Sequence, residues 1–172
     1  MNKTVASVKL RAMEPEDLEL LYTIENDRSI WGVGATNVPY SHYVLHDYMA
    51  QATGDIYTDK QVRLVIENDK GEVVGLVDLV NFDPKNLRAE LGLIIQKPFR
   101  RQGYSEATML KLHDYASEVL HLHQVYAIIS VENKPSLALF QKLGYHQSDE
   151  LKDWLFDGKT YSPAVIVSKI FQ

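Results

Sequence analysis

A basic turn that contains glycine is the segment best suited to carry chemistry. An apolar stretch, Leu91 to Ile95, leads through Pro98 into the sequence Arg100-Arg101-Gln102-Gly103-Tyr104-Ser105-Glu106. A helix that starts here would present unpaired N–H groups and partial positive charge, which together hold a phosphate. Gly103 would let the backbone approach an anion closely. The alternative is an ordinary strand-to-helix turn with two solvated arginines.

A single carboxylate, Glu90, lies just before this turn on the same predicted strand. Its neighbours on the strand are mostly apolar, beginning with Ala89 and Leu91. A free alkyl amine is mostly protonated at neutral pH, so a reaction at an amine nitrogen needs a base. Glu90 is therefore the candidate base. The alternatives are an edge residue that points to solvent, or a partner for Arg88.

Other kinds of chemistry lack the residues that they need. The chain contains no cysteine, which excludes a thiol nucleophile and a cysteine-ligated zinc site and suits a reducing cytosol. His42 and His46 are four residues apart, but without a third ligand they are a weak zinc signal, and we expect no metal. Gly158-Lys159-Thr160 resembles the end of a phosphate-binding loop, yet it falls between two predicted strands. A hairpin turn explains it better.

Composition limits the classes of function further. The chain has 172 residues, 45% of them hydrophobic and 24% charged, as in an ordinary globular domain, and we predict one domain over residues 1–172. Eighteen basic against 23 acidic residues give a net charge of −5, which disfavours a nucleic-acid partner and slightly favours a cationic acceptor. No apolar run is long enough for a membrane span or a signal peptide, so we expect a cytoplasmic protein without a membrane partner.

Hydrophobic periodicity predicts a mixed α/β fold that positions the turn and Glu90. The predicted strands are 5–13, 62–67, 73–80, 87–95, 125–131, 151–156 and 161–168. The predicted helices are 14–25, 41–51, 102–120 and 135–143. The order is β-α-α-β-β-β-α-β-α-β-β, which combines an antiparallel half with a βαβ half.

A second segment, downstream of the basic turn, makes the pattern specific. Asn133 ends a predicted strand, and the helix that follows ends in Lys142-Leu143-Gly144-Tyr145. The two segments together resemble the GCN5-related N-acetyltransferases. That family has a pyrophosphate loop Gln/Arg-x-x-Gly-x-Gly/Ala, matched here by Arg100, Gly103 and, as a small replacement, Ser105. Its second signature combines an asparagine with Tyr-x-Lys-x-Gly-Phe/Tyr.

Three further features resemble the branch that contains ribosomal-protein N-terminal acetyltransferases and spermidine acetyltransferases. They are Ala89-Glu90, the pair Asn26 and Arg28, and Val38-Pro39-Tyr40. The resemblance implies the GNAT fold, in which helices flank a twisted, mixed and mostly antiparallel sheet. It implies transfer of an acetyl group from acetyl-CoA, as co-substrate, to a primary amine. The acceptor would be a small molecule such as a polyamine, or a protein N-terminus, and a homo-oligomer is compatible with it.

The resemblance also implies where acetyl-CoA binds. Backbone amides around Leu93, Ile94 and Ile95 would polarise the thioester carbonyl, and Glu90 would be catalytic. The other implied cofactor-binding residues are Arg100, Arg101, Gln102, Gly103, Tyr104, Ser105, Glu106, Asn133, Phe140 and Lys142.

Two departures from the family pattern affect the expected activity. Phe140 occupies the position where most of the family has a tyrosine, which is thought to protonate the departing thiolate. Reduced activity, a different acid such as Tyr145 or a water, and a non-catalytic acyl-CoA-binding regulatory module are therefore open. Thr36-Asn37-Val38 stands where the spermidine enzymes carry acidic residues, which weakens the case for a polyamine.

Overall fold

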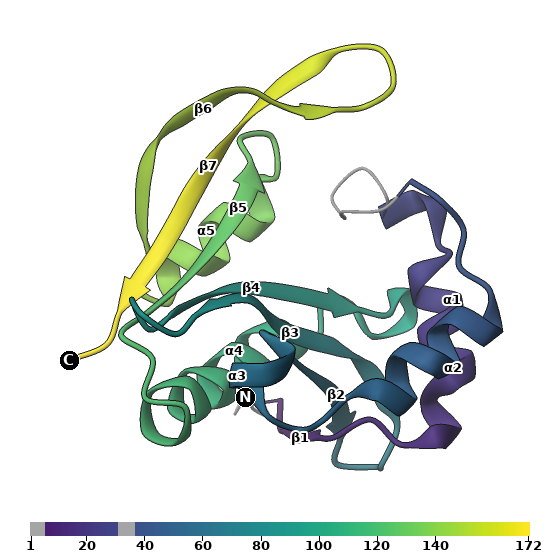
Figure 1. The fold of residues 1–172 in the computed structure, drawn as a ribbon. Helices are drawn as coiled ribbons and strands as arrows, with labels where there is room; N and C mark the ends of the chain where they lie inside the picture. The colour runs from purple at the N-terminus through teal and green to yellow at the C-terminus, as the bar shows by residue number, and fades with distance from the viewer. Residues whose placement is uncertain (1–5, 31–36) are drawn as a thin grey trace, which may run out of the picture.

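A single seven-stranded sheet in the order β1-β2-β3-β4-β5-β7-β6 organises the molecule (Figure 1). The structure, a computed structural model, describes residues 6–30 and 37–172; Val5 of the first predicted strand and Thr36 lie outside these ranges. The strands are β1 (Val8–Arg11), β2 (Val62–Asn68), β3 (Val73–Asp83), β4 (Arg88–Ile95), β5 (Gln124–Ser130), β6 (His146–Phe156) and β7 (Tyr161–Ile170). The β4–β5 pair is parallel and every other pair is antiparallel.

The α-helices follow the predicted order with one addition. They are α1 (Leu18–Glu25), α2 (His42–Gln51), α3 (Ile56–Asp59), α4 (Tyr104–Asp114) and α5 (Lys134–Lys142). Short 3₁₀ turns cover Pro15–Asp17, Arg28–Ile30 and Lys97–Phe99, and a π-helical turn, Tyr115–Val119, continues α4. The predicted mixed α/β architecture is confirmed. The α3 turn was not predicted, and β6 begins five residues before the predicted strand.

Two apolar clusters lie on opposite faces of the sheet. The larger one packs Met109 and Leu112 of α4 against strand residues such as Leu91 and Val125. The smaller one packs α1 and α2 against β2 and β3, through residues such as Leu21 and Leu45. Strand alternation explains this division, because successive side chains point to opposite faces. In Figure 1, α1 and α2 accordingly lie to one side of the sheet and α4 below it.

The parallel pair β4–β5 is registered at only three positions. Arg88, Ala89 and Glu90 pair with Gln124, Val125 and Tyr126. Beyond Glu90, β4 continues to Ile95 beside β3, and β5 continues to Ser130 beside β7. The two strands therefore diverge, as Figure 1 shows, and the sheet splits into two halves that meet at Glu90 and Tyr126. The far part of β4 is left without registered pairing to β5.

An irregularity in β3 lies opposite the start of β4. The register of β3 with β4 is regular as far as Val80, which pairs with Glu90, and resumes at Asp83, which pairs with Arg88. Asn81, between them, has a positive φ of 52°. This combination is a β-bulge, which bends a strand and re-aims a side chain.

Among the helices of the described ranges, none is long and apolar enough to cross a membrane.

Candidate active site

The predicted phosphate site lies at the start of α4, where the left-handed backbone of Gly103 opens the helix. The φ of Gly103 is 85° and that of Arg101 is 63°. Backbone N–H groups converge in such turns and form anion-binding concavities. The N–H groups in the first turn of α4 add to these, because they have no partner within the helix. The backbone therefore provides an anion cradle even before side-chain charge is considered.

A cavity of about 190 Å³ lies against this turn. It contains seven of the residues predicted to bind acetyl-CoA: Ile95, Arg100, Arg101, Gly103, Tyr104, Ser105 and Glu106. Phe99 and Leu139 complete the wall. These two were not predicted, and only their proximity in sequence to predicted site residues could have indicated them. The end of β4, the turn, the start of α4 and α5 thus meet at one place.

Two side chains of the turn serve to hold its shape. Arg100 donates from Nε to the carbonyl oxygen of Ile95 at 2.9 Å, which ties the turn to the end of β4. Gln102 donates to the carbonyl oxygen of Pro98 at 3.0 Å. These two bonds tie the turn to β4 and to Pro98, and Arg101 is the arginine of the turn that is not used in this way within the described residues.

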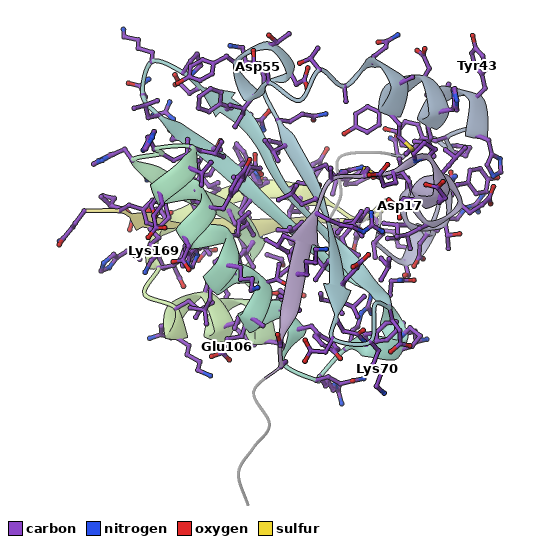
Figure 2. All side chains as sticks on the ribbon, turned by 90° about the horizontal axis from the view of Figure 1, so that it is seen from below. Asp17, Tyr43, Asp55, Lys70, Glu106 and Lys169 are labelled. Carbon is purple, nitrogen blue, oxygen red and sulfur yellow. The ribbon has the colours of Figure 1, made fainter. Side chains whose placement is uncertain are left out.

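The helix α5 brings the second signature to the same region. The Asn133 side chain caps it by accepting from the backbone N–H of Ser136 at 3.3 Å. The Lys142 ammonium lies 2.7 Å from the carboxylate of Glu106, which is labelled in Figure 2 in the first turn of α4. This ion pair joins the ends of the two signature segments. The pair is neutral overall, so Lys142 offsets the negative charge of Glu106 near the cradle.

Phe140 lies behind the cavity wall and not on it. Its ring is only 7% exposed and packs edge-on against Tyr145, with 4.7 Å between centroids. The Tyr145 hydroxyl lies 2.7 Å from Nε2 of the buried His113, and burial raises the Tyr145 pKa far above its usual range. The Tyr145 hydroxyl is therefore hydrogen-bonded to a residue of α4, which weakens the idea that Tyr145 replaces the missing acid.

Glu90 lies at the point where β4 and β5 separate. Its side chain accepts a hydrogen bond from Asn81 Nδ2 at 2.8 Å and is partly buried. Arg88 pairs instead with Asp83, at 3.3 Å. The two alternatives for Glu90 were a solvent-facing edge residue and a partner of Arg88. Both therefore have less support than a role as a base at the point where β4 and β5 separate.

Tyr126 faces the same side of the sheet as Glu90, because the two are registered neighbours on adjacent parallel strands. Burial raises the pKa of the Tyr126 hydroxyl, and the charge of Glu90 raises it further. The phenol therefore stays protonated at neutral pH.

A charged cluster covers the same face farther from the split. Arg63 of β2 donates to Glu25 of α1 and to Asp78 of β3, both at 2.7 Å. Asp78 is registered with Gly92 of β4, and a Cβ on that glycine would lie 3.7 Å from the carboxylate. Asp78 therefore lies beside the diverging part of β4. This cluster was not predicted from the sequence, although charged residues inside two apolar strands were a signal for it.

His42, the first of the two histidines four residues apart, contacts side chains of α1. His42 lies 3.1 Å from Glu19 and stacks on Tyr22, with ring centroids 3.7 Å apart. Across residues 6–30 and 37–172, no three histidine or carboxylate side chains are arranged to hold a metal ion.

A larger cavity, of about 610 Å³, opens at the outer edge of β2 where β1 no longer covers it. Its wall is mostly apolar and includes Met13, Met49, Leu64 and Tyr115. Two strands, β2 and β3, separate it from β4. We place the reaction at the smaller cavity, because only that one joins an anion cradle to the divergent strands.

Acyl transfer from a CoA thioester to an amine needs a hold on the pyrophosphate, a polarised carbonyl and a path for a proton. The turn before α4 can supply the first, and the open stretch of β4 can supply the second, since backbone N–H groups stabilise a developing oxyanion. A carboxylate at the point where β4 and β5 separate, which is Glu90, suits the third. Together with the split sheet, these features define an acyl-CoA N-acyltransferase.

The chain belongs to the GNAT acetyltransferase family. The family model described as an acetyltransferase (GNAT) domain matches residues 7–146. The spermidine N(1)-acetyltransferase of Escherichia coli (strain K12) is 32% identical over 160 residues, which cover 92% of this chain and 83% of that protein. A putative ribosomal N-acetyltransferase of Bacillus subtilis (strain 168), YdaF, is 29% identical over 158 residues, which cover 87% of this chain and 83% of that protein. The protein is thus an N-acetyltransferase that uses acetyl-CoA, as its sequence predicted.

The fold agrees with a solved relative. The crystal structure of spermidine N-acetyltransferase from Vibrio cholerae in complex with CoA and spermine superposes with a TM-score of 0.84. The two chains are 24% identical, and the match covers 95% of each.

Proposed function

We propose that the protein acetylates a primary amine of a small polycationic acceptor of the polyamine class, with Glu90 as general base. The observation that carries this proposal is the charge around the divergent strands. The four carboxylates Glu25, Asp78, Asp83 and Glu90 outnumber the two arginines of the same region, Arg63 and Arg88. An excess of carboxylates attracts a cationic amine and orients it. The E. coli spermidine enzyme, similar along most of the chain, supports the same class of acceptor.

The proposed reaction uses the side chains as follows. Glu90, directly or through a water, takes a proton from the ammonium of the acceptor, and the free amine attacks the thioester carbonyl. Backbone N–H groups between Leu93 and Ile95 hold the oxyanion. The C–S bond then breaks, CoA leaves as a thiolate, and the nitrogen of the new amide releases its remaining extra proton to the thiolate or to solvent. A thiol titrates near ~8.5, so the thiolate needs only modest help to leave, and activity is compatible with Phe140.

Residues 93–95, 100–106, 133, 140 and 142 remain our proposed acetyl-CoA site. Support is strongest for the seven residues around the cavity. Phe140 contributes through packing behind Leu139, whose side chain lies on the wall. Lys142 contributes through its ion pair with Glu106.

A protein N-terminus is the second candidate acceptor. It is favoured by Asn37 and Val38, which are neutral and exposed, and by the likeness to the putative ribosomal enzyme of B. subtilis. The deciding experiment measures CoA release with spermidine, spermine and N-terminal peptides, and identifies each product by mass spectrometry. Acetylation of peptides alone would refute the polyamine proposal.

The role of Glu90 is tested with Glu90→Gln, which keeps the shape and removes the base. We expect a rate loss at neutral pH that becomes smaller at high pH, where more of the amine is already neutral. Glu118→Gln, an exposed carboxylate after α4, is the matched control. An unaltered pH–rate profile in Glu90→Gln would remove Glu90 from the mechanism.

A homo-oligomer is also part of the proposal. The edge strand β6 exposes almost all of its side chains, and Trp154, Phe156 and Tyr161 are more than half exposed near the tip of its hairpin. An exposed edge strand of this length favours pairing with a second copy. Sedimentation of wild type and Trp154→Glu tests this, and a wild-type monomer at micromolar concentration would refute it.

A further inference from the structure

The β-bulge in β3 changes which residues of that strand face Glu90. Val77 and Leu79 belong to the larger apolar core, so simple alternation would place residue 81 in the same core. Instead Phe82, only 5% exposed, occupies that core position, and Asn81 is exposed. One residue has therefore been inserted into the alternation, and that residue is Asn81.

The bulge directs the inserted side chain to a defined partner. Asn81 Nδ2 donates to Glu90 Oε2 at 2.8 Å. The φ of 52° places Asn81 in the left-handed region, which asparagine tolerates better than most residues other than glycine. Residue type, backbone conformation and hydrogen bond agree, whereas a bulge used only to bend the strand would not need an amide side chain.

We propose that Asn81 is a positioning residue, held in a β-bulge to fix the orientation and favour the charged form of Glu90. The inference rests on the proposed function of Glu90. An N–H group that donates to a carboxylate stabilises its ionised state, and it also leaves the second oxygen free to face an acceptor. A neutral donor does this without repelling a cationic amine, as an arginine at this position would.

The other groups around Glu90 set the background on which Asn81 acts. Arg88 on β4 and Asp83 on β3 are the nearby charged residues, and they pair with each other at 3.3 Å. Tyr126 on β5 is neutral at working pH and adds no charge. These two charges offset each other, whereas the hydrogen bond from Asn81 singles out one oxygen of Glu90.

The test compares Asn81→Gly and Asn81→Asp with wild type across pH. Glycine accepts the left-handed backbone and removes the donor, so the acidic limb of the kcat/KM profile should move up by about half a pH unit. Aspartate replaces the donor with a like charge beside the carboxylate, and the repulsion should move the limb up by about one unit. At pH 7, Asn81→Gly should lower kcat/KM by up to about tenfold.

A matched control comes from the same connection between β3 and β4. The side chain of Asn86 donates to Asp83, and not to Glu90, at 2.8 Å. Asn86→Ala should leave the acidic limb in place. A merely structural role of Asn81 would lower the rate or the melting temperature without moving the limb. Limbs that coincide in wild type and both Asn81 variants would overturn the proposal.

A second readout separates this inference from the proposal for Glu90. The carboxyl carbon of Glu90, assigned by its loss in Glu90→Gln, can be titrated by NMR in the unliganded protein. Its midpoint should rise in Asn81→Gly and rise further in Asn81→Asp. If Glu90→Gln leaves the pH–rate profile unchanged, Glu90 is not the base, yet the NMR titration still decides whether Asn81 controls its ionisation. Unchanged midpoints would refute that control.

Discussion

Replacing Gly103 by valine should weaken CoA binding by about 100-fold without harming the chemistry of the thioester. The φ of Gly103 is 85°, and a left-handed conformation costs an L-residue about 1–2 kcal/mol. Its new Cβ would lie 3.4 Å from Cβ of Ala6, so the side chain also meets a neighbour. The turn should relax toward an ordinary conformation and turn its N–H groups away from the cavity.

The expected loss follows from the bonds to the anion. A hydrogen bond to a charged group contributes about 1.5–3 kcal/mol, so the loss of one or two such bonds raises the Kd by about 10- to 1,000-fold or more. Isothermal titration with CoA measures this directly. Acetylpantetheine, which lacks the pyrophosphate, should be turned over by wild type and Gly103→Val at similar kcat/KM. Equal losses for acetylpantetheine and acetyl-CoA would mean that the variant damages more than the cradle.

The matched control is Gly71→Val in the turn between β2 and β3. Its φ is 75°, so the backbone strain is comparable, and nothing lies within 4 Å of its Cβ position. We expect a similar loss of stability and unchanged CoA affinity. A Gly103→Val variant that binds CoA within about threefold of wild type would refute the role of the turn, and so would a Gly71→Val variant that loses as much affinity as Gly103→Val.

Three further predictions concern the core behind the site. If the position of the family acid is vacant, Phe140→Tyr should raise kcat about tenfold, which is less than the rate gain that a general acid usually provides. An unchanged or lower kcat would count against a vacant acid position. Gly75→Ala should destabilise the protein by about 1–3 kcal/mol in urea unfolding, because the new Cβ would overlap a backbone carbonyl of β4. Gly92→Ala is the control: its Cβ meets only ordinary contacts, so its urea midpoint should be nearly unchanged. Burial lowers the pKa of His113 from 6.5 to about 4, so the unfolded state binds the proton first. Stability should therefore fall by up to about 3 kcal/mol as pH drops from 6.5 to 4, and a His113→Phe variant with the same loss would refute this.

Local pattern sufficed to predict most elements of the fold. Alternation and β-branched residues marked the strands, and Pro98 followed by Gly103 marked the strand-to-helix turn. These signals are local, because each depends on side chains within a few residues of one another. The identity of the family followed from two such local signals at the correct spacing.

The features that make the site reactive depend on register between distant segments. Nothing in β4 or β5 alone indicates that their pairing stops at Glu90 and Tyr126. The sequence also could not predict which side of α5 faces the cavity. It therefore did not distinguish Leu139, which lies on the cavity wall, from Phe140, which lies behind it. The bulge had a signal, because an asparagine delays the next core residue to Phe82, but its contact with Glu90 required the register.

The short β4–β5 ladder links the folding of the protein to the supply of its co-substrate. Three registered pairs join β1–β4 to β5–β7, so backbone hydrogen bonding between the halves is sparse, although the larger core spans both. A ligand that binds between the diverging strands contacts both halves of the sheet. Its binding raises the free energy of unfolding by RT ln(1 + [L]/Kd), which is about 2.7 kcal/mol at a hundredfold excess over Kd. We expect the amide protons beyond Glu90 to exchange more slowly as acetyl-CoA rises. The resistance of the enzyme to unfolding and proteolysis would then track the acetyl-CoA level of its surroundings.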